Sequence, residues 1–170
     1  MRYHYKKTYE KSAAFFRARP RLIALLFLLN RILTLLFAIA YFSLAVYAAT
    51  RLPDDLFIIG AIGAFALCLA AVWVLRIAVD RARPYEETGA GISPLVEKRS
   101  GGRSFPSRHT ACAFAVATAF LPLSVWFALP LYVLGAGLAY VRFALGWHYP
   151  SDLIGGAAIG TVCGLIVFLF

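Results

Sequence analysis

The sequence predicts an all-α integral membrane helix bundle, with about five transmembrane helices and an N-terminal amphipathic helix at the membrane interface. Hydrophobic residues make up 62% of the 170 residues, and the mean hydropathy of +0.77 exceeds that of a soluble domain. Several apolar runs approach the roughly 20 residues that a helix needs to cross a bilayer. The net charge of +9 indicates that the chain binds anionic lipid headgroups or phosphorylated substrates. We expect no nucleic-acid partner, because most of the chain cannot lie in water.

Residues 1–31 predict a basic, aromatic segment at the interface, ahead of a membrane bundle over 32–170. Basic side chains interleaved with tyrosine and phenylalanine are typical of a helix in the lipid headgroup layer. The polar pair Asn30-Arg31 interrupts the first apolar run, so we expect the first span to begin after it. Seven basic residues precede position 22: Arg2, Lys6, Lys7, Lys11, Arg17, Arg19 and Arg21.

Five segments have the composition of membrane spans, and the third is the shortest. They cover about 32–50, 56–79, 107–123, 125–145 and 151–170. Small residues at helical spacing in the last span predict a close approach to a neighbouring helix, namely Gly156, Gly160 and Gly164.

Two tight turns and one long loop connect the expected spans. The turns lie at 51–55 and 121–126. Residues 83–103 form the only long polar stretch of the sequence, with the glycines, proline and charges of a loop. A loop of this length inside a compact domain is often functional.

Connectivity brings three polar clusters to one membrane face. The second span ends near Arg76, and the loop from Arg83 returns on that side to the start of the third span. The fourth span crosses back and ends near Arg142, so the fifth also starts there. The side chains that we expect to meet are Arg76, Arg83, Ser107, Arg108, His109, Arg142, His148 and Asp152.

These residue types suit an anion of the size of phosphate. Ser107 follows a proline and is a candidate N-cap, and a helix N-terminus offers free N–H groups and the positive end of a dipole. Arginine forks match phosphate oxygens. Asp152 comes four residues after His148, and a carboxylate can orient an imidazole by accepting its N–H. His109 is a second histidine for the same site.

In these clusters the sequence resembles the type 2 phosphatidic acid phosphatase superfamily of integral membrane lipid phosphatases. The family motif K-x6-R-P is matched by RIAVDRARP, with Arg76 in place of lysine. The motif P-S-G-H is matched by PSRH, with Arg108 in place of glycine. The motif S-R-x5-H-x3-D is matched by VRFALGWHYPSD, with Val141 in place of serine. Each motif alone is weak, but all three in order at these spacings, over about residues 56–170, are specific.

The resemblance implies a lipid phosphatase that forms a covalent phosphohistidine and needs no metal and no cofactor. It implies that His148 attacks phosphorus, that Asp152 holds the ring of His148, and that His109 protonates the leaving lipid oxygen. Fixed hydrogen-bond donors would stabilise the negative charge of the phosphoryl oxygens. The implied contacts are Arg76, Arg83, Ser107 and Arg142, to which Arg108 adds a cation that favours a pyrophosphate.

The orientation and the substrate are open at this point. The basic N-terminus and the positive-inside rule predict a site on the cytoplasmic side of the bacterial inner membrane, whereas a hairpin hidden in 22–50 would reverse it. The small size and the lack of an extra soluble domain indicate a bacterial lipid phosphatase. Undecaprenyl pyrophosphate, phosphatidylglycerophosphate and phosphatidic acid all fit. Two alternatives are a non-catalytic membrane scaffold that keeps the fold, and a vanadium-dependent peroxidase, a class with the same motifs whose members are typically soluble.

Overall fold

The structure is helical throughout, as the sequence predicts. This computed structural model describes residues 2–51, 55–87, 91–97 and 102–169, and within these ranges there is no strand. The expected turn at 51–55 and the expected loop at 83–103 fall partly outside them. The helices are α1 (Arg2–Arg17), α2 (Pro20–Arg51), α3 (Asp55–Val79), α4 (Arg108–Ala119), α5 (Val125–Ala144), α6 (Pro150–Gly164) and the 3-10 helix η1 (Leu165–Leu169).

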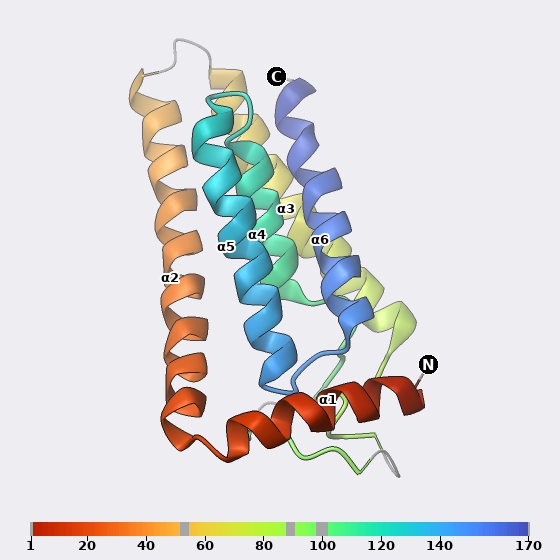
Figure 1. The fold of residues 1–170 in the computed structure, drawn as a ribbon. Coiled ribbons are helices and arrows are strands. Elements are labelled where there is room, and N and C mark those ends of the chain that lie inside the picture. Colours follow the sequence, from red (N-terminus) through yellow and green to blue (C-terminus); the bar gives the residue numbers. More distant parts are fainter. Residues whose placement is uncertain (1, 52–54, 88–90, 98–101, 170) are drawn as a thin grey trace.

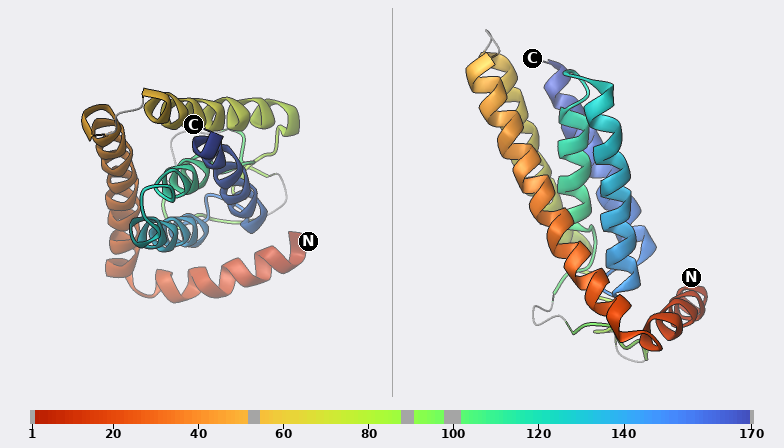
Figure 2. Two further views of the ribbon diagram at one scale, coloured as in Figure 1. Left: turned by 90° about the horizontal axis from the view of Figure 1, so that it is seen from above. Right: turned by 60° about the vertical axis from the view of Figure 1, so that its left-hand side comes forward.

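A short central helix, α4, organises the bundle. Helices α2 to α6 run side by side (Figures 1 and 2), and α4 contacts each of the other four. Its sequence RHTACAFAVATA is rich in alanine and largely buried, so neighbouring helices approach it closely from several sides. The four longer helices therefore enclose the helix that begins with Arg108.

Four helices in the described part of the chain are long and apolar enough to cross a membrane. They are Pro20–Arg51, Leu56–Val79, Val125–Ala144 and Pro150–Leu169. With 12 residues, α4 is only about 18 Å long, against roughly 30 Å of hydrocarbon. The expected third span over 107–123 is therefore a shorter helix, screened from lipid by its neighbours. The chain is a multi-pass integral membrane protein.

The first span begins earlier than the sequence indicated. α2 starts at Pro20, a residue that fits the first turn of a helix, and continues without a break to Arg51. Asn30 is buried on the bundle side, and the Arg31 guanidinium lies 4.6 Å from the centre of the Phe27 ring. These two polar residues therefore do not interrupt the helix, and the expected start after residue 31 is wrong. The continuous helix also excludes a hairpin within 22–50.

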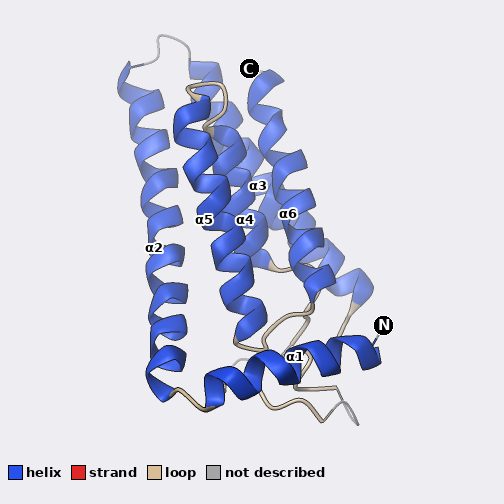
Figure 3. Cartoon of the chain, in the orientation of Figure 1, coloured by secondary structure: helices blue, strands red, loops and turns tan. Residues whose placement is uncertain are grey.

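The N-terminal helix α1 lies across the end of the bundle where the long loop runs (Figures 1 and 3). Tyr5, Tyr9 and Ala13 form its buried face and pack against Ile92 and Tyr149. The tyrosines expected at the lipid surface thus include two that contact protein. The exposed side of α1 remains basic, with Lys6, Lys7 and Lys11.

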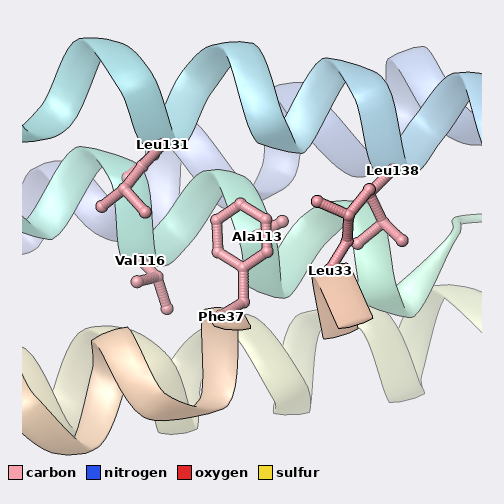
Figure 4. Close-up of a cluster of buried hydrophobic side chains, with 7 residues drawn as sticks. Leu33, Phe37, Ala113, Val116, Leu131 and Leu138 are labelled. Carbon is pink, nitrogen blue, oxygen red and sulfur yellow. The ribbon is translucent and has the colours of Figure 1, made fainter. Parts of the chain in front are cut away.

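An apolar cluster holds α2 against α4 and α5. Figure 4 shows the Phe37 ring of α2 beside Ala113 and Val116 of α4, with Leu131 and Leu138 of α5 on the opposite side. Each of these side chains is buried. The cluster fixes α2 as one wall of the groove described below.

Helix α6 packs on α4 through a face of glycines. A side chain at Gly160 would collide with the backbone carbonyl of Ala111, and one at Gly156 would lie 2.6 Å from the Ser107 carbonyl oxygen. A side chain at Gly164 would lie 2.5 Å from Thr118 Cβ. The close helix approach predicted from the glycine spacing is confirmed, and α4 is the helix that α6 approaches.

We predict that Gly160→Ala lowers the free energy of unfolding by about 1–3 kcal/mol, because the new methyl group must push α6 away from α4. The matched control is Gly137→Ala in α5, where an added Cβ meets no atom within 4 Å. That variant should match the native protein or gain up to about 1 kcal/mol from helix propensity. Thermal melting in detergent measures both, and equal effects would contradict the close contact.

Candidate active site

The polar clusters predicted from sequence meet at the end of the bundle crossed by α1. The end of α3, the segment 102–107, the turn 145–149 and the starts of α4 and α6 come together there (Figure 3). The Ser107 N–H donates to the Asp152 carbonyl at 2.9 Å, which joins the starts of α4 and α6 directly. Non-helical backbone at this depth is compatible with a membrane because protein surrounds it.

His148 is held in one orientation by a backbone carbonyl. Its Nδ1 lies 3.1 Å from the Ser104 carbonyl oxygen and 3.6 Å from Asp152 Oδ2. A carbonyl oxygen can only accept, so Nδ1 carries the hydrogen and Nε2 of the neutral ring has a free lone pair. The side chain is almost completely buried. Nε2 is therefore the unprotonated nitrogen of the neutral His148 ring.

The surroundings of His148 keep its ring neutral. The pKa of His148 is lowered to about 4, chiefly by burial and also by the cations of Arg83 and Arg142, while the hydrogen bond and charge of Asp152 oppose the shift. The imidazole is thus neutral at pH 7 despite the nearby carboxylate.

Two buried arginines flank His148 and differ in their partners. Arg83 donates from Nε to the Gly102 carbonyl at 3.1 Å and from Nη1 to the Trp147 carbonyl at 3.3 Å. Arg142 is 2% exposed, and its Nε and Nη1 have no hydrogen-bond partner among the described residues. Its guanidinium lies 5.6 Å from the centre of the Trp147 ring. A buried cation with unpaired donors is costly unless an anion binds it.

The other two expected arginines lie around the same point. Arg76 donates from Nε to the Pro106 carbonyl at 3.1 Å, just before α4, and Arg108 is the exposed first residue of α4. The charges of Arg76, Arg83 and Arg108 all act on Arg142. Four guanidinium groups from three separate segments thus repel one another, and a bound phosphate would relieve this repulsion.

Ser107 occupies the expected N-cap position, but its hydroxyl does not cap the helix. The hydroxyl pairs with Thr110 Oγ1 at 3.0 Å. Its backbone N–H is used by Asp152, as described above. The contribution of Ser107 to an anion site is therefore the position of the α4 N-terminus.

An apolar groove opens beside His109. It has a volume of about 320 Å³ and lies between α2, α3, α4 and α5. Phe37 and Tyr41 of α2 and Phe65 of α3 line it, and Arg108 and His109 lie on its wall at the start of α4. The groove leads from hydrocarbon-facing helices to two of the predicted site residues.

Sequence reasoning missed two residues that hold the site together. Arg81 Nη1 donates to Asp152 Oδ1 at 2.9 Å, and the Ser104 hydroxyl donates to Asp152 Oδ2. Arg81 lies at an unspecified position of RIAVDRARP, and Ser104 lies just before PSRH. The available signal was their place in the sequence, since Arg81 comes two residues before Arg83 and Ser104 three before Ser107.

The fold and the cluster of buried polar groups define a class, a multi-pass helical membrane protein with a site at one end of the bundle. The family profile of the PAP2 superfamily matches residues 55–170. The chain belongs to the PAP2 superfamily.

Several named relatives are phosphatases. Lipid A 4'-phosphatase of Bacteroides thetaiotaomicron is 35% identical over 99 residues, which is 55% of this chain and 44% of that protein. Undecaprenyl-diphosphatase BcrC of Bacillus subtilis is 29% identical over 65% of this chain and 69% of its own length. Decaprenylphosphoryl-5-phosphoribose phosphatase of Mycobacterium tuberculosis is 34% identical over 76% of this chain and 70% of its own. The chain thus spans less than half of the first of these proteins.

Two solved structures share the fold. LpxE of Aquifex aeolicus is 26% identical, with a TM-score of 0.62, over 86% of this chain and 94% of that one. A PAP2-type phosphatidylglycerolphosphate phosphatase from Bacillus subtilis has a TM-score of 0.71 at 20% identity, over 98% of this chain and 84% of that one. The second likeness concerns the fold alone.

The difference between Arg142 and Arg83 predicts opposite effects on stability. Without phosphate, Arg142→Met should raise the free energy of unfolding by about 1–4 kcal/mol, because it removes a buried, unpaired charge. Arg83→Met should lower it by about 2 kcal/mol, because two carbonyl groups lose their donor. Melting in phosphate-free detergent measures both variants. Destabilisation by Arg142→Met would show that its guanidinium is already satisfied.

The pKa of His148 predicts a pH dependence of stability. The unfolded chain binds the His148 proton near pH 6.5 and the folded protein only near pH 4, so folding loses stability as the pH falls between these values. Between pH 7 and pH 4 this loss should be about 3 kcal/mol, and it should be absent in His148→Gln. Denaturation curves of the two proteins at several pH values test it, and parallel pH dependences would contradict the burial of a neutral His148.

Proposed function

We propose that the chain is a membrane lipid phosphatase that hydrolyses a lipid phosphate or pyrophosphate through a phosphohistidine on His148. The observation that carries this proposal is the buried Arg142, whose Nε and Nη1 have no hydrogen-bond partner among the described residues, beside a neutral His148 whose unprotonated nitrogen is Nε2. The named phosphatases among the relatives support the same reaction class.

In the first step, Nε2 of His148 attacks phosphorus in line with the lipid oxygen. The P–N bond forms as the P–O bond to the lipid breaks, and His109 gives a proton to the departing oxygen. The charge spread over the three other oxygens is met by the arginines, chiefly Arg142, which needs no rearrangement to bind. Asp152 and the Ser104 carbonyl stabilise the positive charge that develops on the His148 ring.

In the second step, water attacks the phosphohistidine. His109, now without its proton, takes one from the water as the new P–O bond forms and the P–N bond breaks. Inorganic phosphate leaves, and both histidines return to their starting states. The two steps together consume only the lipid phosphate and one water molecule.

The lipid part of the substrate is assigned to the apolar groove. Its wall carries mostly aromatic and aliphatic side chains, and the basic residues Arg108 and His109 line it at the start of α4. A long acyl or prenyl chain would fill the apolar part and bring its phosphate ester to His109. The expected cation of Arg108 would meet a second phosphate, which favours a pyrophosphate over a monophosphate.

The membrane bilayer is the partner of this enzyme, and we place it in the bacterial inner membrane. α1 lies at the same end as the site, so the N-terminal basic charges and the site share one face. By the positive-inside rule this face is cytoplasmic. Cysteine-accessibility labelling at exposed Ser151 beside the site tests the orientation, and labelling from the outer side would contradict it.

A substrate panel with purified full-length protein in detergent tests the function. Undecaprenyl pyrophosphate, phosphatidylglycerophosphate and phosphatidic acid are compared for release of inorganic phosphate. The native protein should hydrolyse at least one, and His148→Ala should lose about 1000-fold or more of the rate, because the nucleophile is absent. Radiolabelled phosphate from the substrate should remain on the protein after rapid denaturation in base, which preserves phosphohistidine.

The same panel separates the alternatives. Equal phosphate release by the native protein and His148→Ala would end the phosphohistidine proposal. A folded native protein without activity on any lipid would support the scaffold. Halide oxidation that depends on added vanadate, without phosphate release, would support the peroxidase.

A further inference from the structure

The Asp152 carboxylate is completely buried and is held by donors from three segments. Arg81 Nη1 donates to Oδ1 at 2.9 Å, and the Tyr149 N–H donates to Oδ2 at 2.9 Å. The Ser104 hydroxyl makes a short hydrogen bond to the same Oδ2. Oδ2 is therefore already occupied by two donors that are closer than His148 Nδ1, at 3.6 Å.

Ser104 links Asp152 to His148. Its carbonyl oxygen accepts from His148 Nδ1 at 3.1 Å, and its hydroxyl is bound to Asp152. Ser104 is fully buried, so neither group can exchange its partner for bulk water. The carboxylate thus orients the imidazole mainly through the backbone of Ser104, because the direct contact is the longer one.

Arg81 secures the other side of this assembly. Its Nη1 also donates to Ser151 Oγ at 2.7 Å, and its guanidinium lies 4.0 Å from the centre of the Tyr149 ring. Its own carbonyl accepts the Ser104 N–H at 2.7 Å. The Arg81 side chain therefore supplies the counter-charge that the buried carboxylate requires, while the Arg81 backbone holds Ser104 beside it.

We propose that Arg81 and Ser104 are positioning residues for His148, and that Asp152 acts on the histidine largely through them. The proposal rests on the function proposed above. Without the Arg81 charge, the carboxylate is no longer compensated and its hydrogen bond to the Ser104 hydroxyl is disturbed, so the Ser104 carbonyl shifts and Nε2 moves off the line of attack. Phosphate binding is retained, because Arg76, Arg83 and Arg142 make none of these contacts.

Arg81→Gln tests the proposal on the substrate that the native protein hydrolyses. The kcat should fall about 100-fold, because misplacement of a reacting atom by about 1 Å has an effect of this size. The KM should stay within about twofold of the native value, because the groups that bind the substrate phosphate are unchanged. Arg81→Lys, which keeps the charge but not the fork to Ser151, should recover part of the rate.

Arg103→Gln is the matched control. Arg103 pairs with Asp80 at 2.6 Å, and both side chains are exposed. It lines the same cleft as Arg81 and carries the same charge, but its side chain donates to Asp80 and not to Asp152 or Ser104. Its kcat should equal that of the native protein. A similar loss of kcat in Arg81→Gln and Arg103→Gln would show that any positive charge in this cleft has the same effect. That result would overturn the proposal.

A double-mutant comparison tests the route through Ser104. In an Asp152→Asn background, Ser104→Ala and Arg81→Gln should each cause little further loss of kcat, because the three groups act as one unit. If each added substitution lowered kcat in the Asp152→Asn background by the same factor as in the native protein, the proposal would be overturned. Ser104→Ala alone, which removes only a hydroxyl, also provides the test if Arg81→Gln does not fold.

Nitrogen NMR of labelled histidine gives a readout that does not depend on activity. The chain has only three histidines, so His148 can be assigned by its absence in His148→Ala. In the native protein Nδ1 should be protonated and Nε2 bare, and Arg81→Gln should show a mixture of both tautomers. An unchanged tautomer in Arg81→Gln would contradict the positioning role. A native protein that shows the expected tautomer but releases no phosphate would instead count against the proposed function.

Discussion

The close contact between α4 and α6 is the constraint on which the rest of the site depends. Glycines on α6 allow its backbone to reach the backbone of α4, and the Ser107 N–H then bonds directly to the Asp152 carbonyl. Two helix N-termini are thereby held side by side at the end of the bundle. Any side chain larger than hydrogen at Gly160 would separate them, and with them the segments that carry Arg108 and His148.

The short length of α4 explains how a charged site can exist in a membrane protein. Because α4 begins within the bundle, Ser104, Pro106 and Ser107 just before it are buried by protein and not exposed to lipid. Most buried polar groups there find partners in backbone carbonyls, as Arg83 does with Gly102 and Trp147. Arg142 differs from Arg83, because its Nε and Nη1 have no hydrogen-bond partner among the described residues.

The N-terminal helix contributes to the site as well as to the membrane surface. The Tyr5 and Tyr149 rings lie with their centres 4.8 Å apart, and the Tyr9 hydroxyl donates to the Ser93 carbonyl at 3.0 Å. Tyr9 also packs against Gly146, whose φ of +79° is one that glycine adopts readily. α1 therefore braces the turn 145–149, which carries His148, from the side opposite the bundle.

The sequence by itself determined the helical membrane class, the glycine face of α6 and the meeting of eight predicted site residues at one end, because hydropathy and connectivity are properties of the chain order. It misplaced the start of α2, since Asn30 packs against the bundle and Arg31 lies over the Phe27 ring within one continuous helix. Only the tertiary structure decided that α4 is too short to span, that Ser107 does not cap it through its hydroxyl, and that Arg81 and Ser104 hold Asp152. Those outcomes depend on which groups meet across elements far apart in sequence, and no local pattern encodes such partners.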